Sequence, residues 1–141
     1  MGQTTARSML EFYLSGVAGP DRPMVLALHG AGADHWQLLP LLAAAAPDCM
    51  VVAPKSGRWS GWSAAGQRYS WFQAAEIPVI EPIGFGDALW QLEQFIWQMV
   101  GGDAQMGFPA RRQACVGFDQ GAVLASCWHR SGRNCSAVWL H

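Results

Sequence analysis

The chain has 141 residues, of which 51% are hydrophobic and 13% are charged, enough for one globular domain with a substantial core. A formal net charge of −1 gives no electrostatic reason to expect nucleic acid or an anionic membrane as a partner. No apolar run approaches the length of a membrane-spanning helix, and the first residues lack the apolar core of a signal peptide, so we expect a cytoplasmic protein.

Strand-like and helix-like segments alternate along the chain. Short continuous apolar runs are typical of strands buried on both faces, and apolar residues three and four apart are typical of helices. The expected elements are a strand at 8–14, a strand at 24–28, a helix at 36–46, a strand at 49–53, a long polar and aromatic loop at 55–74, a helix at 82–100, a strand at 114–118, a helix continuing to about 130, and a strand at 137–140.

This order predicts an α/β fold with a mostly parallel sheet and helices on both faces. The carboxyl ends of the strands are where such sheets place their functional groups. The eight tryptophans are expected in the core and in pocket linings. The four cysteines show no CxxC pair, so we expect small buried side chains rather than disulfides or a metal site. No nucleotide-binding motif is present, and no cofactor is expected.

The segment Gly117-Phe118-Asp119-Gln120-Gly121 follows an apolar run and opens a helical pattern. This is the outline of a nucleophile elbow, the strained strand-to-helix turn that holds a catalytic side chain above an α/β-hydrolase sheet. Its glycines leave room where a Cβ would collide with the neighbouring strand and helix. The usual central residue is serine, and here it is aspartate.

Four segments together resemble the phospholipase/carboxylesterase family of α/β-hydrolases, which includes the acyl-protein thioesterases. They are Leu28-His29-Gly30-x-Gly32, Ala53-Pro54, Tyr69-Ser70-Trp71-Phe72 and the segment 117–121. The family pattern at the elbow is G-F-S-Q-G, and four of its five positions match. The resemblance covers nearly all of this chain but about the N-terminal two-thirds of a family member. It implies a partial α/β-hydrolase fold, a single domain over 1–141 that lacks the C-terminal part carrying the triad acid and histidine.

The resemblance also implies a site for a small ester or acyl ligand. By position, the backbone N–H groups of Ala31 and Gln120 would form an oxyanion hole. Trp71 would help shape the pocket, and His35 lies on the same functional edge. The supporting motif positions are His29, Gly30, Gly32, Gly117 and Gly121.

Three interpretations of Asp119 are open. It is a carboxylate nucleophile, as in the haloalkane dehalogenases and epoxide hydrolases that this turn resembles. It marks an esterase elbow that has lost its nucleophile. Or it is a negative charge placed favourably at a helix N-terminus. The second and third are compatible, and we favour them together.

No histidine in the sequence is an evident base for Asp119. His29 is expected to be a structural hydrogen-bonding residue. His129 lies ten residues beyond Asp119 on the same expected helix, about 15 Å away at 1.5 Å per residue. His35 and His141 lie on the functional edge, but no third group is evident to orient either one.

We therefore expect a carboxylic-ester or thioester hydrolase by resemblance, weak or inactive because of Asp119 and the absent acid and histidine. The alternatives are a non-catalytic ligand-binding or assembly module, and an Asp-nucleophile hydrolase of the dehalogenase or epoxide hydrolase type. The strand at 137–140 is expected to present an unpaired apolar edge, which predicts self-association.

Overall fold

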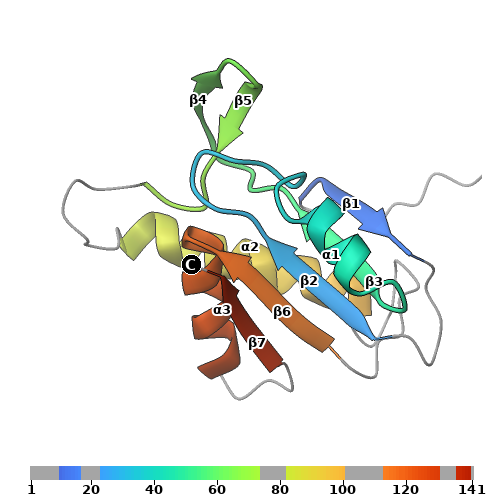
Figure 1. Cartoon of the computed structure of the whole chain (residues 1–141). Helices are drawn as coiled ribbons and strands as arrows, with labels where there is room; N and C mark the ends of the chain where they lie inside the picture. The colour runs from blue at the N-terminus through green and yellow to red at the C-terminus, as the bar shows by residue number, and fades with distance from the viewer. Residues whose placement is uncertain (1–9, 17–22, 74–81, 101–112, 131–135, 141) are drawn as a thin grey trace, which may run out of the picture.

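The computed structural model describes residues 10–16, 23–73, 82–100, 113–130 and 136–140 (Figure 1). Five strands form one sheet in the order β1-β3-β2-β6-β7, and two more form a separate hairpin. β1 runs antiparallel to β3, whereas the other neighbours in the sheet are parallel. The strands of the sheet are β1 (Phe12–Ser15), β2 (Met24–Leu28), β3 (Met50–Pro54), β6 (Gln113–Phe118) and β7 (Ser136–Leu140).

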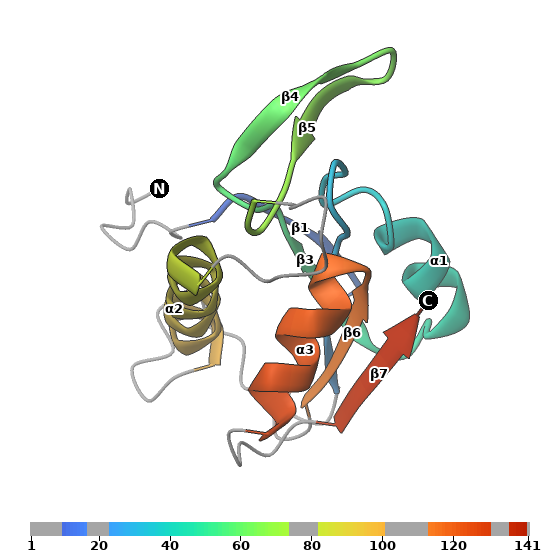
Figure 2. The same ribbon diagram turned by 90° about the vertical axis from the view of Figure 1, so that its left-hand side faces the viewer.

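Helices cover both faces of this sheet, as the sequence predicted (Figures 1 and 2). α1 (Leu39–Ala45) lies on one face, and α2 (Pro82–Val100) and α3 (Gln120–Arg130) lie on the other. The larger of the two apolar cores joins the sheet to α2 and α3, with Leu28, Leu92 and Leu124 fully buried. Burying one such side chain contributes roughly 1.5–3 kcal/mol.

The central strands form where the apolar runs predicted them. All five residues of β2 and all five of β3 are buried, because each strand has helices or loops on both faces. The expected helix at 36–46 starts later, at Leu39. The Asp34 carboxylate accepts the Trp36 N–H at 2.9 Å and so fixes a turn before the helix, while Pro40 occupies its first turn.

The prediction of a loop over 55–74 is wrong in part, because this segment contains a β-hairpin. β4 (Trp59–Ser63) and β5 (Gly66–Tyr69) pair antiparallel and project beyond the carboxyl ends of the sheet strands (Figures 1 and 2). Gly66 has φ of 121°, which suits the tight turn before it. Most hairpin residues are exposed, so the segment lacks the apolar pattern of a buried strand.

The expectation that the tryptophans lie in the core is wrong for most of those described, although Trp59 lines a pocket, as the same expectation included. Trp71 is 2% exposed, but five others are between 53% and 67% exposed: Trp36, Trp59, Trp62, Trp90 and Trp97. Trp90 and Trp97 lie two helical turns apart on the outer side of α2. Composition counts aromatic residues but does not say which face of an element presents them. The side chains of Trp128 and Trp139 lie outside the described residues.

The described cysteines, Cys49, Cys115 and Cys127, are all free thiols, and Cys115 is buried. Cys135 lies outside the described residues. Within the described ranges, no three histidine, cysteine or carboxylate side chains come together as a metal site would require. None of the described helices has the length and apolar character needed to span a membrane.

Candidate active site at the carboxyl end of the sheet

The loops after β2, β3 and β6 meet at one edge of the sheet. Parallel strands that are neighbours in a sheet bring their carboxyl ends together, and β2 lies between β3 and β6. The residues brought together are His29 to Gly32 after β2, Ser56 after β3 and Asp119 after β6. Just after the first of these loops, an isolated backbone bridge pairs Ala33 with Tyr69 of the hairpin.

Asp119 occupies a strained turn between β6 and α3. Its φ of 55° lies in the left-handed region, and it is the one non-glycine residue with positive φ in the described chain. A Cβ on Gly117 would overlap the Gly121 backbone, and a Cβ on Gly121 would overlap the Leu28 carbonyl. The close packing of β6, α3 and β2 therefore requires glycine on both sides of Asp119.

The exposed carboxylate of Asp119 binds the neighbouring loop. Its Oδ2 accepts the backbone N–H of Ala31 at 3.0 Å. The Asp119 backbone carbonyl accepts the N–H groups of Ala122 and Val123 and so begins α3. The side-chain bond thus runs across to Ala31 on the loop after β2, and the residue itself lies immediately before the first residue of α3.

The loop after β2 is held by three consecutive backbone donors. The Gly30 N–H binds Gln37 Oε1 at 2.7 Å, the Ala31 N–H binds Asp119, and the Gly32 N–H binds Ser70 Oγ at 3.1 Å. A Cβ on Gly30 would lie 2.9 Å from the Phe118 ring, and Gly32 has φ of 69°. The small residues at these positions let the loop lie against the turn at Asp119.

His29 is a structural residue, as expected. It is 1% exposed, its Nδ1 donates to the Gly30 carbonyl at 2.7 Å, and its Nε2 accepts the Ser56 N–H at 3.0 Å. Burial lowers the pKa of His29 to about 4, although the Gly30 carbonyl opposes the shift. The ring is therefore neutral and both of its nitrogens already form hydrogen bonds. His29 is not positioned to act as a base for Asp119.

Gln120 fastens the segment after the hairpin to the same turn. Its Oε1 accepts the N–H groups of Trp71 and Phe72 at 2.9 and 3.4 Å, and its Nε2 donates to the Phe72 carbonyl at 2.9 Å. Gln120 is 5% exposed. The sequence predicted a role for its backbone N–H, but its side chain was not predicted to form these contacts.

The two side chains predicted to line a substrate pocket serve other contacts. Trp71 is buried, its Nε1 donates to the His29 carbonyl at 2.9 Å, and its ring stacks on His29. His35 stacks on Tyr13 of β1 with 4.0 Å between ring centroids. The side chain of His129, and all of His141, lie outside the described residues.

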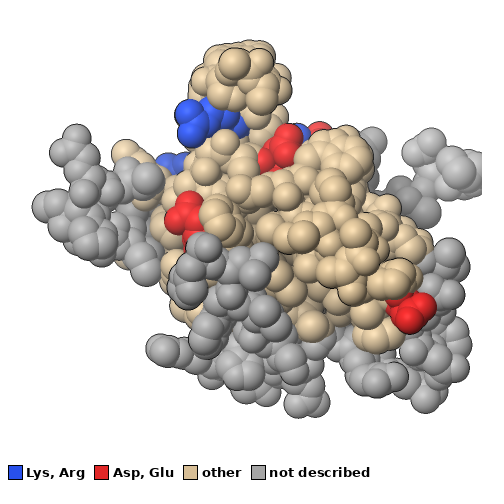
Figure 3. All heavy atoms as spheres, viewed as in Figure 1, with Lys and Arg blue, Asp and Glu red and all other residues tan. Residues whose placement is uncertain are grey.

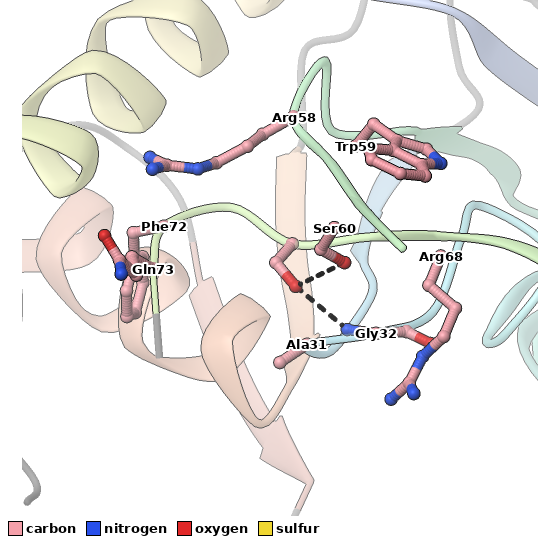
Figure 4. A pocket seen from close by; sticks show the side chains of 9 residues that line it. Ala31, Gly32, Arg58, Trp59, Ser60, Arg68, Phe72 and Gln73 are labelled. Carbon is pink, nitrogen blue, oxygen red and sulfur yellow. Dashed lines mark hydrogen bonds between the residues drawn. The ribbon is translucent and has the colours of Figure 1, made fainter. Parts of the chain in front are cut away.

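A pocket of about 430 Å³ lies between the hairpin and the loop after β2 (Figure 4). Ala31 and Gly32 line one side, and Arg58, Trp59 and Arg68 belong to the hairpin side. The two arginines are not among the site residues expected from the sequence, because the sequence predicts a loop over 55–74. The signal that could have found them is the pair of aromatic and polar stretches separated by Ala64-Ala65-Gly66.

Known structures share this fold. A carboxylesterase from Bacillus cereus superposes with a TM-score of 0.72 and 18% identity, over 95% of this chain and 60% of that chain. The esterase PE8 is 28% identical with a TM-score of 0.61, over 83% of this chain and 55% of that one. Acyl-protein thioesterase 2 from Zea mays is 16% identical with a TM-score of 0.60, over 92% of this chain and 60% of that one.

This chain has an α/β-hydrolase fold. The predicted similarity to carboxylesterases and acyl-protein thioesterases is confirmed in structure. The fold is a partial one, since the chain spans only 55–60% of the length of the three proteins above. In sequence, no family model and no curated protein matches it.

Proposed function

We propose that this chain is a hydrolase-type domain that binds a small carboxylic ester, thioester or acyl ligand and turns it over slowly or not at all. The observation that carries the proposal is the bond from the Ala31 N–H to the Asp119 carboxylate. In this proposal the turn at Asp119 is a nucleophile elbow. Ala31 and Gln120 supply the N–H groups that would face an oxyanion.

The contact at Ala31 opposes acyl transfer in two ways. A developing oxyanion needs donors that are not already bonded, and the loss of one such donor costs roughly 3–4 kcal/mol of barrier. The Asp119 charge also lies where a second negative charge would form, and like charges at short range repel. Attack by the carboxylate on an acyl carbon would produce an anhydride, a product less stable than the ester.

The likeness to known structures supports the ester class. The chain resembles the esterase PE8 at 28% identity, as well as proteins described as carboxylesterase and acyl-protein thioesterase. The contacts of the described histidines support the proposal that turnover is weak. Both nitrogens of His29 already form hydrogen bonds, and His35 stacks on Tyr13. Ester hydrolysis by a serine nucleophile needs a base within hydrogen-bond reach of that serine.

The test is hydrolysis of p-nitrophenyl butyrate by the wild type, by Asp119→Ala and by Asp119→Ser. We expect the wild type and Asp119→Ala to stay within about tenfold of one another, because Asp119 forms no productive acyl intermediate. Asp119→Ser is expected to gain little without a positioned base. Asp48→Ala, which removes an exposed carboxylate far from the site, is the control. Wild-type turnover that vanishes in Asp119→Ala, or strong turnover by Asp119→Ser, would contradict the proposal.

Two alternatives to this proposal are distinguished by experiment. Because Ala31 fixes Oδ2, the carboxylate is oriented for attack on an sp³ carbon, as an Asp-nucleophile hydrolase would require. A mass adduct at Asp119 after incubation with a haloalkane or epoxide would favour that reaction. A non-catalytic binding or assembly module is favoured by ligand binding without turnover. In the assembly case β7, one of the two edge strands of the described sheet, would pair with a second copy.

A further inference from the structure

The pocket beneath the hairpin is cationic. Arg58 and Arg68 both line it, and no carboxylate is among its lining residues in the described part of the chain. The whole sequence carries a net charge of −1, so two arginines at one small pocket are not a consequence of a generally basic surface. Lys and Arg atoms gather at the base of the hairpin in the space-filling view (Figure 3).

The two arginines approach the pocket from opposite sides. Arg58, just before β4, extends toward Phe72 and Gln73, whereas Arg68 of β5 lies beyond Ser60, close to Gly32 (Figure 4). Arg68 is anchored because its Nε donates to the Gly32 carbonyl at 3.2 Å. Its guanidinium packs so closely on Gly32 that a Cβ there would overlap it. This anchoring gives the cation a defined position instead of a freely moving one.

The remaining wall combines hydroxyl groups with an aromatic ring. Ser70 Oγ accepts the Gly32 N–H and donates to Ser60 Oγ, each at 3.1 Å (Figure 4). Trp59 is 54% exposed and packs edge-to-face with Trp62. An exposed indole offers an apolar surface to a flat or aliphatic group at low entropic cost. A volume of about 430 Å³ is within the range of small-molecule sites.

We propose that this pocket selects small anionic ligands, in which a carboxylate or phosphate group binds Arg68 and an apolar group lies on Trp59. Guanidinium groups form charge-assisted, often paired hydrogen bonds with both kinds of anion. The inference deepens the proposed function by naming a ligand class, namely acyl or ester compounds that also bear a negative charge. Its test measures binding alone and needs no turnover.

The site also fixes the orientation of such a ligand. Ala31 lines the pocket and donates to the Asp119 carboxylate, so one end of the pocket is next to a negative charge. Repulsion by Asp119 and attraction by Arg68 both place the anionic group on the β5 side of the pocket. The acyl or ester group then lies toward Ala31.

The probes are 2-naphthoate, 2-naphthyl phosphate and the neutral 2-naphthalenemethanol, titrated into the wild-type protein and followed by NMR. The acids should bind at least about tenfold more tightly than the neutral compound, and this difference should shrink in high salt. Preferential binding of either acid supports the proposal, and the tighter one identifies the anion. Equal affinity for all three compounds would overturn it.

Variants locate the binding. Arg68→Gln should weaken binding of the tighter acid about tenfold, the loss expected for one charge-assisted hydrogen bond, whereas Arg58→Gln, on the opposite side of the pocket, should weaken it less. Arg68→Lys keeps the charge and should recover part of that loss, which separates recognition of charge from damage to the loop at Gly32. Lys55→Gln removes one positive charge outside the pocket and should leave the affinity within twofold. Unchanged affinity in Arg68→Gln would overturn the proposal.

Discussion

Gly121→Ala is expected to lower the free energy of unfolding by about 3 kcal/mol or more. The added methyl would overlap the Leu28 carbonyl and lie 2.7 Å from the His29 carbonyl oxygen. Both are backbone atoms, one at the end of β2 and one in the loop that follows, so no rotamer change can relieve the collision. Overpacking of a well-packed site costs roughly 1–3 kcal/mol and more where the backbone must move. Urea denaturation monitored by circular dichroism measures the loss.

Gly86→Ala is the matched control. Gly86 lies in α2, and an added methyl there meets no atom within 4 Å. Alanine is the better helix former, so this variant should be more stable than the wild type by about 0.5–1 kcal/mol. If Gly121→Ala were as stable as Gly86→Ala, this result would contradict the close approach of α3 to β2.

Acidification from pH 7 to pH 5 is expected to lower the free energy of unfolding by about 2 kcal/mol through His29 alone. The pKa of His29 is about 4 in the folded chain and 6.5 ordinarily. As the pH falls below 6.5, the unfolded chain takes up the proton while the buried ring resists it. The stabilisation that the neutral His29 contributes is therefore present above pH 6.5 and is lost progressively as the pH falls from 6.5 to about 4. Urea denaturation at both pH values measures the change.

His29→Gln should remove most of this dependence. Burial also lowers the pKa of His35, which acts in the same direction, so His35→Gln is measured beside it. If His29→Gln does not fold, NMR titration of the wild-type imidazole gives the pKa directly. Titration of His29 above pH 6 would contradict its burial between Gly30 and Ser56.

The layered fold could be predicted because its signals are local. The buried strands are continuous apolar runs, and α2 spans Pro82–Val100 as its helical periodicity indicated. The hairpin could not be predicted in the same way. Its residues are largely exposed, and β4 and β5 pair chiefly with one another. An exposed hairpin has no buried face to impose an alternating pattern on its sequence.

The sequence indicated which segments lie close together, but not the contacts between them, and their role as an active site stays a prediction. The segments at His29 and Asp119 do meet at one edge of the sheet, because the strand order brings β2 beside β6. Which atoms meet depends on side-chain rotamers and on contacts between residues distant in sequence. The bond between Ala31 and Asp119 spans 88 residues, and no local pattern encodes it. The same is true of Gln120 with Phe72 and of Arg68 with Gly32.

The most direct test of the central claim is the NMR signal of the Ala31 amide proton in the wild type and in Asp119→Ala. The claim is that the Asp119 carboxylate occupies the donor that ester hydrolysis would need. An amide proton that is hydrogen-bonded to a carboxylate resonates downfield. The Ala31 amide signal should therefore move upfield in Asp119→Ala, where this hydrogen bond is lost. The Ser56 amide, which binds His29, should keep its position. An Ala31 signal that is the same in both proteins would contradict the claim.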